Sequence, residues 1–190
     1  MSRGYLEATP DIKPSIGVYS PSQDISITAV RGPRGSFFFA HKIEFRDRNA
    51  VSYTLTLPTS KGQMTIPQLG GTLTMPGRDT RIHVTDYELG GNMALVYCTA
   101  EIFTWQQYHD RTVLVLYGEA GETHELLFKR DPSNMTIATS SDVQTKEDGK
   151  YLYAQWKIGA VNDQFIRAGN LHILLLGKSR LLTGGHNQLN

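Results

Sequence analysis

Hydrolysis by a pair of carboxylates is the first chemistry that the residue types of this sequence make worth testing. The acidic residues in or beside strand-like segments are Asp79, Asp86, Glu88, Glu101, Glu122 and Glu125. Retaining glycoside hydrolysis requires two carboxylates about 5–5.5 Å apart across a cleft. Their spacing predicts no such pair, because Asp79 and Glu122 belong to turns and Asp86 ends a strand. We interpret Glu101, which has apolar neighbours, as a half-buried glutamate paired with an arginine.

Metal binding and nucleophilic catalysis find little support in the other reactive residues. The histidines are His41, His83, His109, His124, His172 and His186. A zinc site requires three or four converging ligands, whereas His83 and Asp86, three residues apart on a strand, face opposite sides. Cys98 is the single cysteine, so we predict no disulfide within the chain and a buried, unreactive thiol. The chain has no nucleophile elbow and no phosphate loop, and we expect neither metal nor cofactor.

Aromatic residues form two groups that suggest carbohydrate binding: Phe103, Trp105 and Tyr108 in the first, and Tyr151, Tyr153 and Trp156 in the second. Flat rings stack against sugar faces through C–H contacts. On a strand, Phe103 and Trp105 share one face, and Trp156 lies opposite Tyr151 and Tyr153. The candidate sugar-binding residues are Trp105, Tyr108, Tyr151, Tyr153 and Trp156. The alternative is that these rings pack in a core or against another domain.

Composition argues against several classes of partner. The 190 residues include 19 basic and 18 acidic residues, for a net charge of +1. A nucleic-acid binder usually has a basic patch, and no apolar run approaches the roughly 20 residues that cross a bilayer. We therefore expect no nucleic-acid or membrane partner. The chain shows no signal peptide, although the glycosylation sequon at Asn134 weakly favours a secreted parent.

Alternation with period 2 dominates the chain and predicts antiparallel strands with one buried face. The apolar members are Tyr53, Leu55, Leu57, Met64, Ile66, Leu73, Met75, Ile82 and Val84. Arg81, His83 and Thr85 should face the opposite, wetter side. The segments 112–117 and 171–176 are apolar on both faces, and we expect them to be central strands covered on both sides.

Turn residues such as Gly70-Gly71, Pro76-Gly77 and Asp148-Gly149 separate these strands at short intervals. This spacing predicts an all-β fold: a many-stranded antiparallel β-sandwich-like domain with at most one short helix. That helix would lie at Val161 to Ala168, and residues 139–150 would form an exposed loop. We expect a single domain over residues 1–182 and a disordered tail at 183–190.

A series of motifs carries a family resemblance. The chain reads YTLTLPTSKGQMTIPQLGGTLTMPGRDTRIHVTDYEL at 53–89, LVYCTAEIFTW at 95–105, RTVLVLYGEAGETHELLF at 111–128, and LHILLL from Leu171. The segments Gly35 to Phe38 and Gly4 to Leu6 belong to the same series of motifs. From about Gly4 to about Leu176 the chain resembles the second domain of fungal β-galactosidases of glycoside hydrolase family 35. Where that family continues through an acidic residue into its next domain, this chain has Gly177 to Leu182.

The resemblance implies a domain that follows a (β/α)₈ barrel carrying both catalytic glutamates and precedes further β-sandwich domains. No catalytic position of the family falls within the matched domain, so no catalytic residue is carried over. A barrel needs about 250 residues, more than this chain has. The leading hypothesis is a non-catalytic accessory domain that packs against the barrel and other β-domains of a secreted, retaining β-galactosidase. The alternatives are a free-standing galactoside-binding module and a self-sufficient glycosidase.

Overall fold

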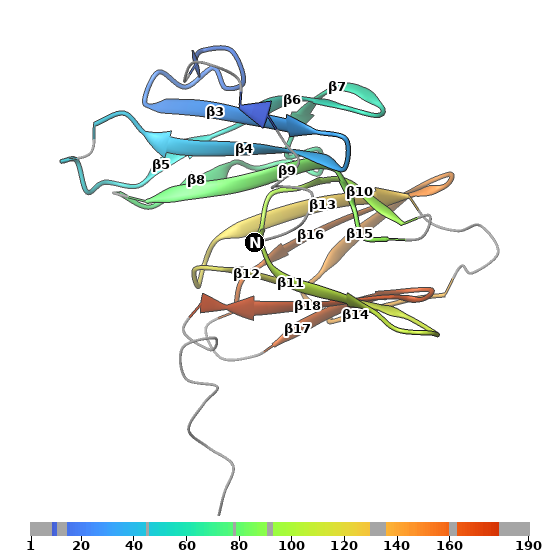
Figure 1. The fold of residues 1–190 in the computed structure, drawn as a ribbon. Coiled ribbons are helices and arrows are strands. Elements are labelled where there is room, and N and C mark those ends of the chain that lie inside the picture. Colours follow the sequence, from blue (N-terminus) through green and yellow to red (C-terminus); the bar gives the residue numbers. More distant parts are fainter. Residues whose placement is uncertain are drawn as a thin grey trace, which may run out of the picture.

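The computed structural model describes residues 9–10, 15–44, 46–77, 79–90, 93–129, 136–159 and 163–178. Its elements over these residues are β-strands, as the period-2 pattern predicts (Figure 1). Within the described part, no helix is long and apolar enough to cross a membrane. The predicted tail from Thr183 and the sequon residue Asn134 both lie outside the described residues.

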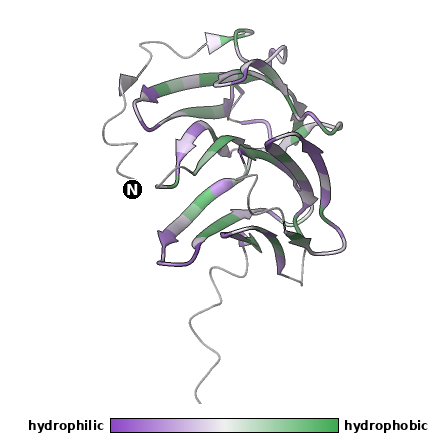
Figure 2. Cartoon of the chain, turned by 90° about the vertical axis from the view of Figure 1, so that its right-hand side faces the viewer, coloured by the Kyte–Doolittle hydropathy of each residue, from purple (hydrophilic) through white to green (hydrophobic). Residues whose placement is uncertain are grey.

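A nine-stranded antiparallel sheet forms the centre of the molecule. Its order is β1-β3-β4-β9-β10-β13-β16-β15, and β2 also pairs with β3. The strands are β1 (Thr9–Pro10), β2 (Ser15–Ile16), β3 (Ile25–Gly32), β4 (Gly35–Lys42), β9 (Thr80–Glu88), β10 (Ala94–Cys98), β13 (Thr123–Lys129), β15 (Gln144–Asp148) and β16 (Tyr151–Lys157). Hydrophilic residues mark many of the hairpin turns, and hydrophobic residues gather along the strands (Figure 2).

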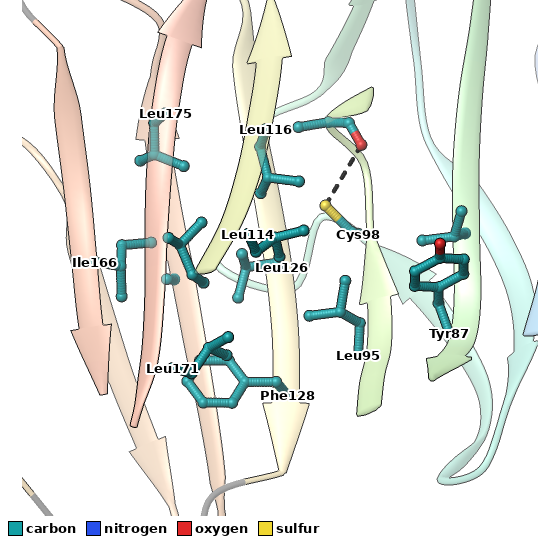
Figure 3. Close-up of a cluster of buried hydrophobic side chains, with 14 of the residues drawn as sticks. Tyr87, Leu95, Cys98, Leu114, Leu116, Leu126, Phe128, Ile166, Leu171 and Leu175 are labelled. Atoms are coloured by element: carbon teal, nitrogen blue, oxygen red, sulfur yellow. Dashed lines mark hydrogen bonds between the residues drawn. The ribbon is translucent and has the colours of Figure 1, made fainter. Parts of the chain in front are cut away.

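A five-stranded sheet covers one face of the central sheet. Its order is β11-β12-β18-β17-β14, with β11 (Glu101–Gln107), β12 (Thr112–Gly118), β14 (Ile137–Thr139), β17 (Gln164–Ala168) and β18 (Leu171–Gly177). The β12–β18 pair is parallel, which departs from the antiparallel expectation. Leu114, Leu116 and Leu175 from this sheet meet Leu126 and Phe128 of β13 in a first buried cluster (Figure 3).

Two short hairpin-like pairs cover the other face of the central sheet. They are β5 (Val51–Tyr53) with β8 (Leu73–Met75), and β6 (Leu55–Thr59) with β7 (Gly62–Ile66). Their buried side chains, including Leu55 and Ile66, pack with Phe38 and Tyr97 of the central sheet in a second cluster. The central sheet is therefore buried on both faces, and the chain forms three layers.

The burial of the central sheet on both faces corrects one expectation. Arg81, His83 and Thr85 were predicted to face water, but they are 5%, 2% and 1% exposed. The alternation along β9 is real, since Val84 and His83 belong to opposite faces. Period 2 distinguishes the two faces of a strand but does not show which face another layer covers.

Three further expectations are corrected. Residues 164–168, placed in a possible helix, form β17, which pairs along its whole length with β18. Residues 144–148, placed in an exposed loop, are exposed but form β15 at the edge of the central sheet. The segments 112–117 and 171–176 are central strands but are covered on one side only, because their residues alternate between buried and partly exposed.

Candidate functional site

The outward side of the five-stranded sheet is a partly exposed and largely apolar surface. Leu114, Leu116 and Leu175 point inward and are at most 1% exposed. The alternate residues of the same strands therefore point outward. These outward residues include Val113, Val115, Tyr117, Phe165, Leu174 and Leu176, and none of them belongs to either buried cluster. We call this surface the outer face.

Cross-strand pairing brings the apolar side chains of the outer face together. Val115 lies directly opposite Leu174, and Tyr117 lies opposite Leu176. The ring of Phe103 packs edge-on against that of Tyr117, with centroids 6.2 Å apart. Phe103 is 58% exposed and Leu174 is 42% exposed. Aliphatic and aromatic side chains thus form a contiguous row across neighbouring strands, which is typical of a surface that contacts another protein surface.

A β-bulge corrects the expectation that Phe103 and Trp105 share a face. The β11–β12 register shifts between Ile102 and Thr104. The extra residue reverses the alternation, so Phe103 points outward while Trp105 packs against the first buried cluster. The indole nitrogen of Trp105 donates to the hydroxyl of Tyr87 at 3.1 Å. Strand periodicity cannot reveal a bulge, because nothing in the local sequence marks it.

The other candidate sugar-binding residues lie on different surfaces. Trp156 is 1% exposed and belongs to the first buried cluster, whereas Tyr153 is 7% exposed and belongs to the second cluster. Their opposite faces agree with the sequence prediction. Tyr151 and Tyr153 share a face as predicted, with the amino group of Lys61 4.0 and 5.5 Å from their ring centroids. Tyr108 is 51% exposed. The five residues therefore do not form one flat platform.

A polar cleft of about 210 Å³ lies at one end of the sandwich, where the chain crosses twice between the two sheets. The crossings are residues 99–100, between β10 and β11, and residues 119–122, between β12 and β13. The cleft is lined by Arg81, Glu101, Tyr117, Gly118, Glu119, Glu122, His124 and Lys178. Gly118 is required by space, because a Cβ atom there would lie 2.3 Å from Nε2 of His124.

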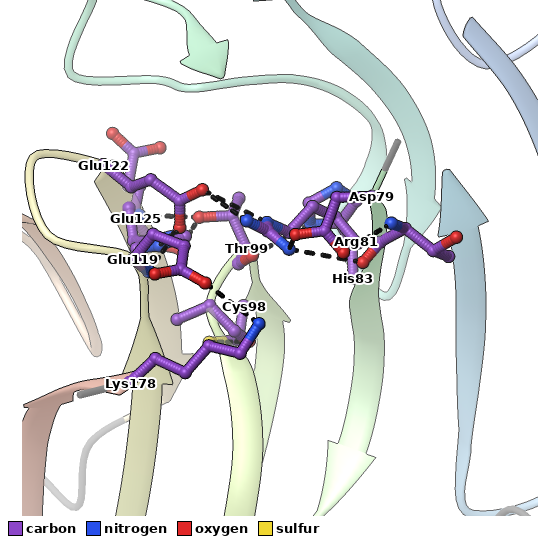
Figure 4. Close-up of polar contacts among 12 residues, drawn as sticks. Asp79, Arg81, His83, Cys98, Thr99, Glu119, Glu122, Glu125 and Lys178 are labelled. Atoms are coloured by element: carbon purple, nitrogen blue, oxygen red, sulfur yellow. Dashed lines mark hydrogen bonds and ion pairs between the residues drawn. The ribbon is translucent and has the colours of Figure 1, made fainter. Parts of the chain in front are cut away.

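A buried ion pair between Arg81 and Glu122 lines this cleft, and Figure 4 shows its contacts. Nη2 of Arg81 donates to Oε1 of Glu122 at 2.6 Å, and Nη1 donates to Asp79. Burial opposes ionisation of Glu122. Hydrogen bonds from His124 and Arg81, with the charge of Arg81, outweigh that penalty and lower the pKa of Glu122 to about 2. Glu122 therefore remains an ionised partner of Arg81. The arginine-paired glutamate predicted from the sequence is Glu122, not Glu101.

Glu125 connects the central sheet with the hairpin layer, which is the layer formed by the β5–β8 and β6–β7 pairs. It is fully buried, and its Oε1 accepts hydrogen bonds from the backbone N–H of Gln68 and the hydroxyl of Tyr97, both at 2.6 Å. Its Oε2 accepts from the backbone N–H of Leu69 at 2.7 Å and from Gln155 at 3.2 Å. Several donors to one carboxylate compensate for its loss of water. Sequence reasoning missed this role, because the donors come from three distant segments.

His83 links the same two layers. Its Nε2 accepts from the hydroxyl of Tyr53 at 2.8 Å, while its Nδ1 donates to the carbonyl of Thr99 at 2.9 Å. Burial is the main cause that lowers the pKa of His83, to about 3. A neutral ring satisfies both contacts at once. His83 is therefore structural, and the described residues contain no group of three or more potential metal ligands.

Two other carboxylates and the thiol also have structural surroundings. Oδ1 of Asp86 accepts from the backbone N–H of Ser60 at 3.0 Å, and Glu88 is exposed at the end of β9. Cys98 is completely buried, as predicted, and burial raises the pKa of its thiol to about 12. Such a thiol is neither charged nor accessible at neutral pH.

Comparison with known proteins agrees with these observations. Residues 8–180 match the family model described as β-galactosidase, domain 2. The chain belongs to this family. It is 42% identical over 182 residues to β-galactosidase A of Aspergillus niger, and 39% identical over 184 residues to β-galactosidase A of Penicillium sp. Each match covers 94% of this chain and 18% of the relative. The resemblance identified in the sequence motifs is thereby confirmed, and the chain spans about a fifth of these relatives' length.

Proposed function

We propose that this chain is a non-catalytic accessory domain that packs against a (β/α)₈ catalytic barrel of a β-galactosidase and supports it. The observation that carries the proposal is the uncovered, largely apolar outer face of the five-stranded sheet. Phe103 and Leu174 are more exposed there than residues of their size usually are. The matched relatives are β-galactosidases about five times longer than the match, so such a parent would supply the missing cover.

The composition of the face fits a contact between domains. Interfaces between domains of one chain typically bury 600–1,500 Å² and are moderately polar. Apolar side chains make up most of the outer face, where His172 and Arg167 lie opposite each other on β18 and β17, and Thr104 and Gln106 lie on the edge strand β11. A sheet that is wet on one side usually alternates with polar residues. Apolar residues on both sides of β12 and β18 favour a second covering layer.

The cleft supports a structural role more than a catalytic one. Both oxygens of Glu122 are engaged, Oε1 by Arg81 and Oε2 by the backbone N–H of Glu119 and by His124. A carboxylate held in this way is poorly placed to attack a sugar or to exchange a proton with it. We expect the catalytic carboxylates, and the secreted location, to belong to the parent.

The packing proposal is tested in a chimera in which residues 8–180 replace the matching segment of the Aspergillus niger enzyme. Leu174→Asp should make this domain unfold at a lower temperature than the remainder in calorimetry, because a charge is then forced into an apolar interface. Val18→Asp, at a residue 64% exposed outside the outer face, is the matched control and should unfold with the remainder. An unchanged transition for Leu174→Asp would contradict the proposal.

The non-catalytic part is tested on the purified chain with a chromogenic β-galactoside and with calorimetric titrations of galactose and lactose. We expect no turnover and no heat of binding. Heat without turnover would instead support a galactoside-binding module, with Tyr108 and Tyr151 as the first residues to replace. Turnover abolished by replacing one carboxylate of this chain would overturn the proposal.

A further inference from the structure

One carboxylate lies where the outer face meets the polar cleft. Glu101 begins β11 and lies directly opposite Tyr117 of β12. Directly paired residues project to the same side of a sheet, so both point outward. Both also line the cleft, and Glu101 is only partly exposed. Glu101 therefore stands at the margin of the apolar surface.

The two cations of the cleft are already engaged by other carboxylates. Arg81 pairs with Glu122 at 2.6 Å and also with Asp79. Lys178 pairs with Glu119 at 2.9 Å (Figure 4). The cleft lining thus contains three carboxylates and two cations, and within the described part of the chain no basic group lies within 4.0 Å of Glu101.

The neighbour of Glu101 is a hydroxyl instead of a cation. Burial raises the pKa of Tyr117, and the hydrogen bond with Glu101 and the charge of Glu101 raise it further. The phenol therefore stays neutral and serves Glu101 as a donor. One neutral donor suffices while water reaches the carboxylate. It is insufficient once water is excluded, because a desolvated carboxylate needs a charge partner or several donors.

We propose that the protein surface covering the outer face presents one basic side chain, arginine or lysine, to Glu101. The inference rests on the proposed function, since it describes the domain that packs there. It adds the chemistry of that partner: apolar opposite Phe103, Val115 and Leu174, and cationic at the end where β11 begins. An arginine fits best, because its planar fork can contact the carboxylate and the Tyr117 hydroxyl together.

The charge at the margin serves to orient the two surfaces. Apolar side chains of similar size permit sliding along the strands, since apolar contact is not directional. A single ion pair at one end of the face would favour one register over others. Covering Glu101 without a cation would leave a buried unpaired charge, which disfavours every other arrangement.

The test compares Glu101→Gln in the chimera and in the isolated chain. Glutamine keeps the shape and removes the charge. In the chimera, we expect native-state proteolysis to release the domain at least about tenfold faster, because a charge pair at an interface is lost. In the isolated chain, the unfolding rate should change less than about twofold, since no basic group among the described residues pairs with Glu101. Glu88→Gln, at an exposed position on β9, is the control in both settings.

The outcomes separate this inference from the proposed function. Faster release by Leu174→Asp with no effect of Glu101→Gln would contradict the proposed basic side chain opposite Glu101. It would still agree with another domain packing on the outer face. No effect of either variant would overturn both. Equal destabilisation by Glu101→Gln in the chimera and in the isolated chain would show that the carboxylate acts within this domain, and would also overturn the inference.

Discussion

The two large sheets of this domain differ in how many of their faces the chain itself covers. The nine-stranded sheet is packed against the five-stranded sheet on one face and against the β5–β8 and β6–β7 pairs on the other. The five-stranded sheet has only its inner face buried, although β12 and β18 are apolar on both faces. The two faces of β12 and β18 are similarly hydrophobic, but the chain buries only the inner one. The outer face is therefore where we expect another protein surface to pack.

Leu175 and Leu174 give the sharpest form of this comparison, because they are neighbours on β18 with 1% and 42% exposure. Replacing Leu175 by alanine should lower the free energy of unfolding of the isolated chain by about 3 kcal/mol, through lost burial and a cavity between the sheets. Urea denaturation measures the change. A loss below about 1 kcal/mol would mean that the inner face is poorly packed.

Glu125 tests whether the second cover depends on one buried carboxylate. Glu125→Gln turns an amide group toward donors from Gln68, Leu69 and Tyr97, so at least one of them loses its acceptor. We expect a loss of about 2 kcal/mol in the free energy of unfolding. Hydrogen exchange should also become faster at the amides of residues 68 and 69. Slow exchange at both amides in the variant would show that the hairpin layer is held by apolar contacts alone.

The free energy of unfolding should depend on pH through His83, which contacts the same covering layer. Its pKa is about 3 in the folded chain and about 6.5 when unfolded. The unfolded state therefore binds more protons between these values, so the stabilisation is complete above pH 6.5 and is lost as pH falls toward 3. In His83→Gln, unfolding near pH 5 should take up about one proton fewer than in the original chain. Equal pH slopes from urea titrations at several pH values would contradict a neutral buried ring.

Glu122 contributes in a lower pH range. Its pKa is lowered to about 2 from the usual value near 4.3. Its contribution is present above about pH 4.3 and is lost as the pH falls toward 2. Glu122→Gln should therefore flatten the loss of stability below pH 4 and leave the slope near pH 6 unchanged. A change in slope only near pH 6 would indicate that a group other than this carboxylate titrates.

The smallest effect is expected at Leu174 in the isolated chain. Leu174→Ala should change the free energy of unfolding by less than about 1 kcal/mol, since the side chain remains largely in contact with water. The same substitution in the chimera should cost more, because the partner surface would then lose its contact. Thermal unfolding of both proteins measures the difference. Similar losses in both would show that no partner surface covers Leu174 in the chimera.

Much of the fold and part of the site were predictable from local patterns. The alternating burial of Tyr53, Leu55 and Leu57 follows from period 2, although the run is divided between β5 and β6, and the buried Cys98 follows from its apolar neighbours. The opposite orientations of Tyr153 and Trp156 follow from period 2. The ordered motifs identified the family, which the match over residues 8–180 confirms. Each of these properties depends on residues close in the chain.

Tertiary structure alone decided which faces are covered. His83 is buried where Tyr53, from the layer formed by residues 51–75, packs against it, and Arg81 is buried where it pairs with Glu122. The bulge at Ile102–Thr104 separates Phe103 from Trp105, and pairing with β18 makes a strand of residues 164–168. The reason is physical: alternation records the two sides of a strand, whereas burial depends on partners that are distant in sequence.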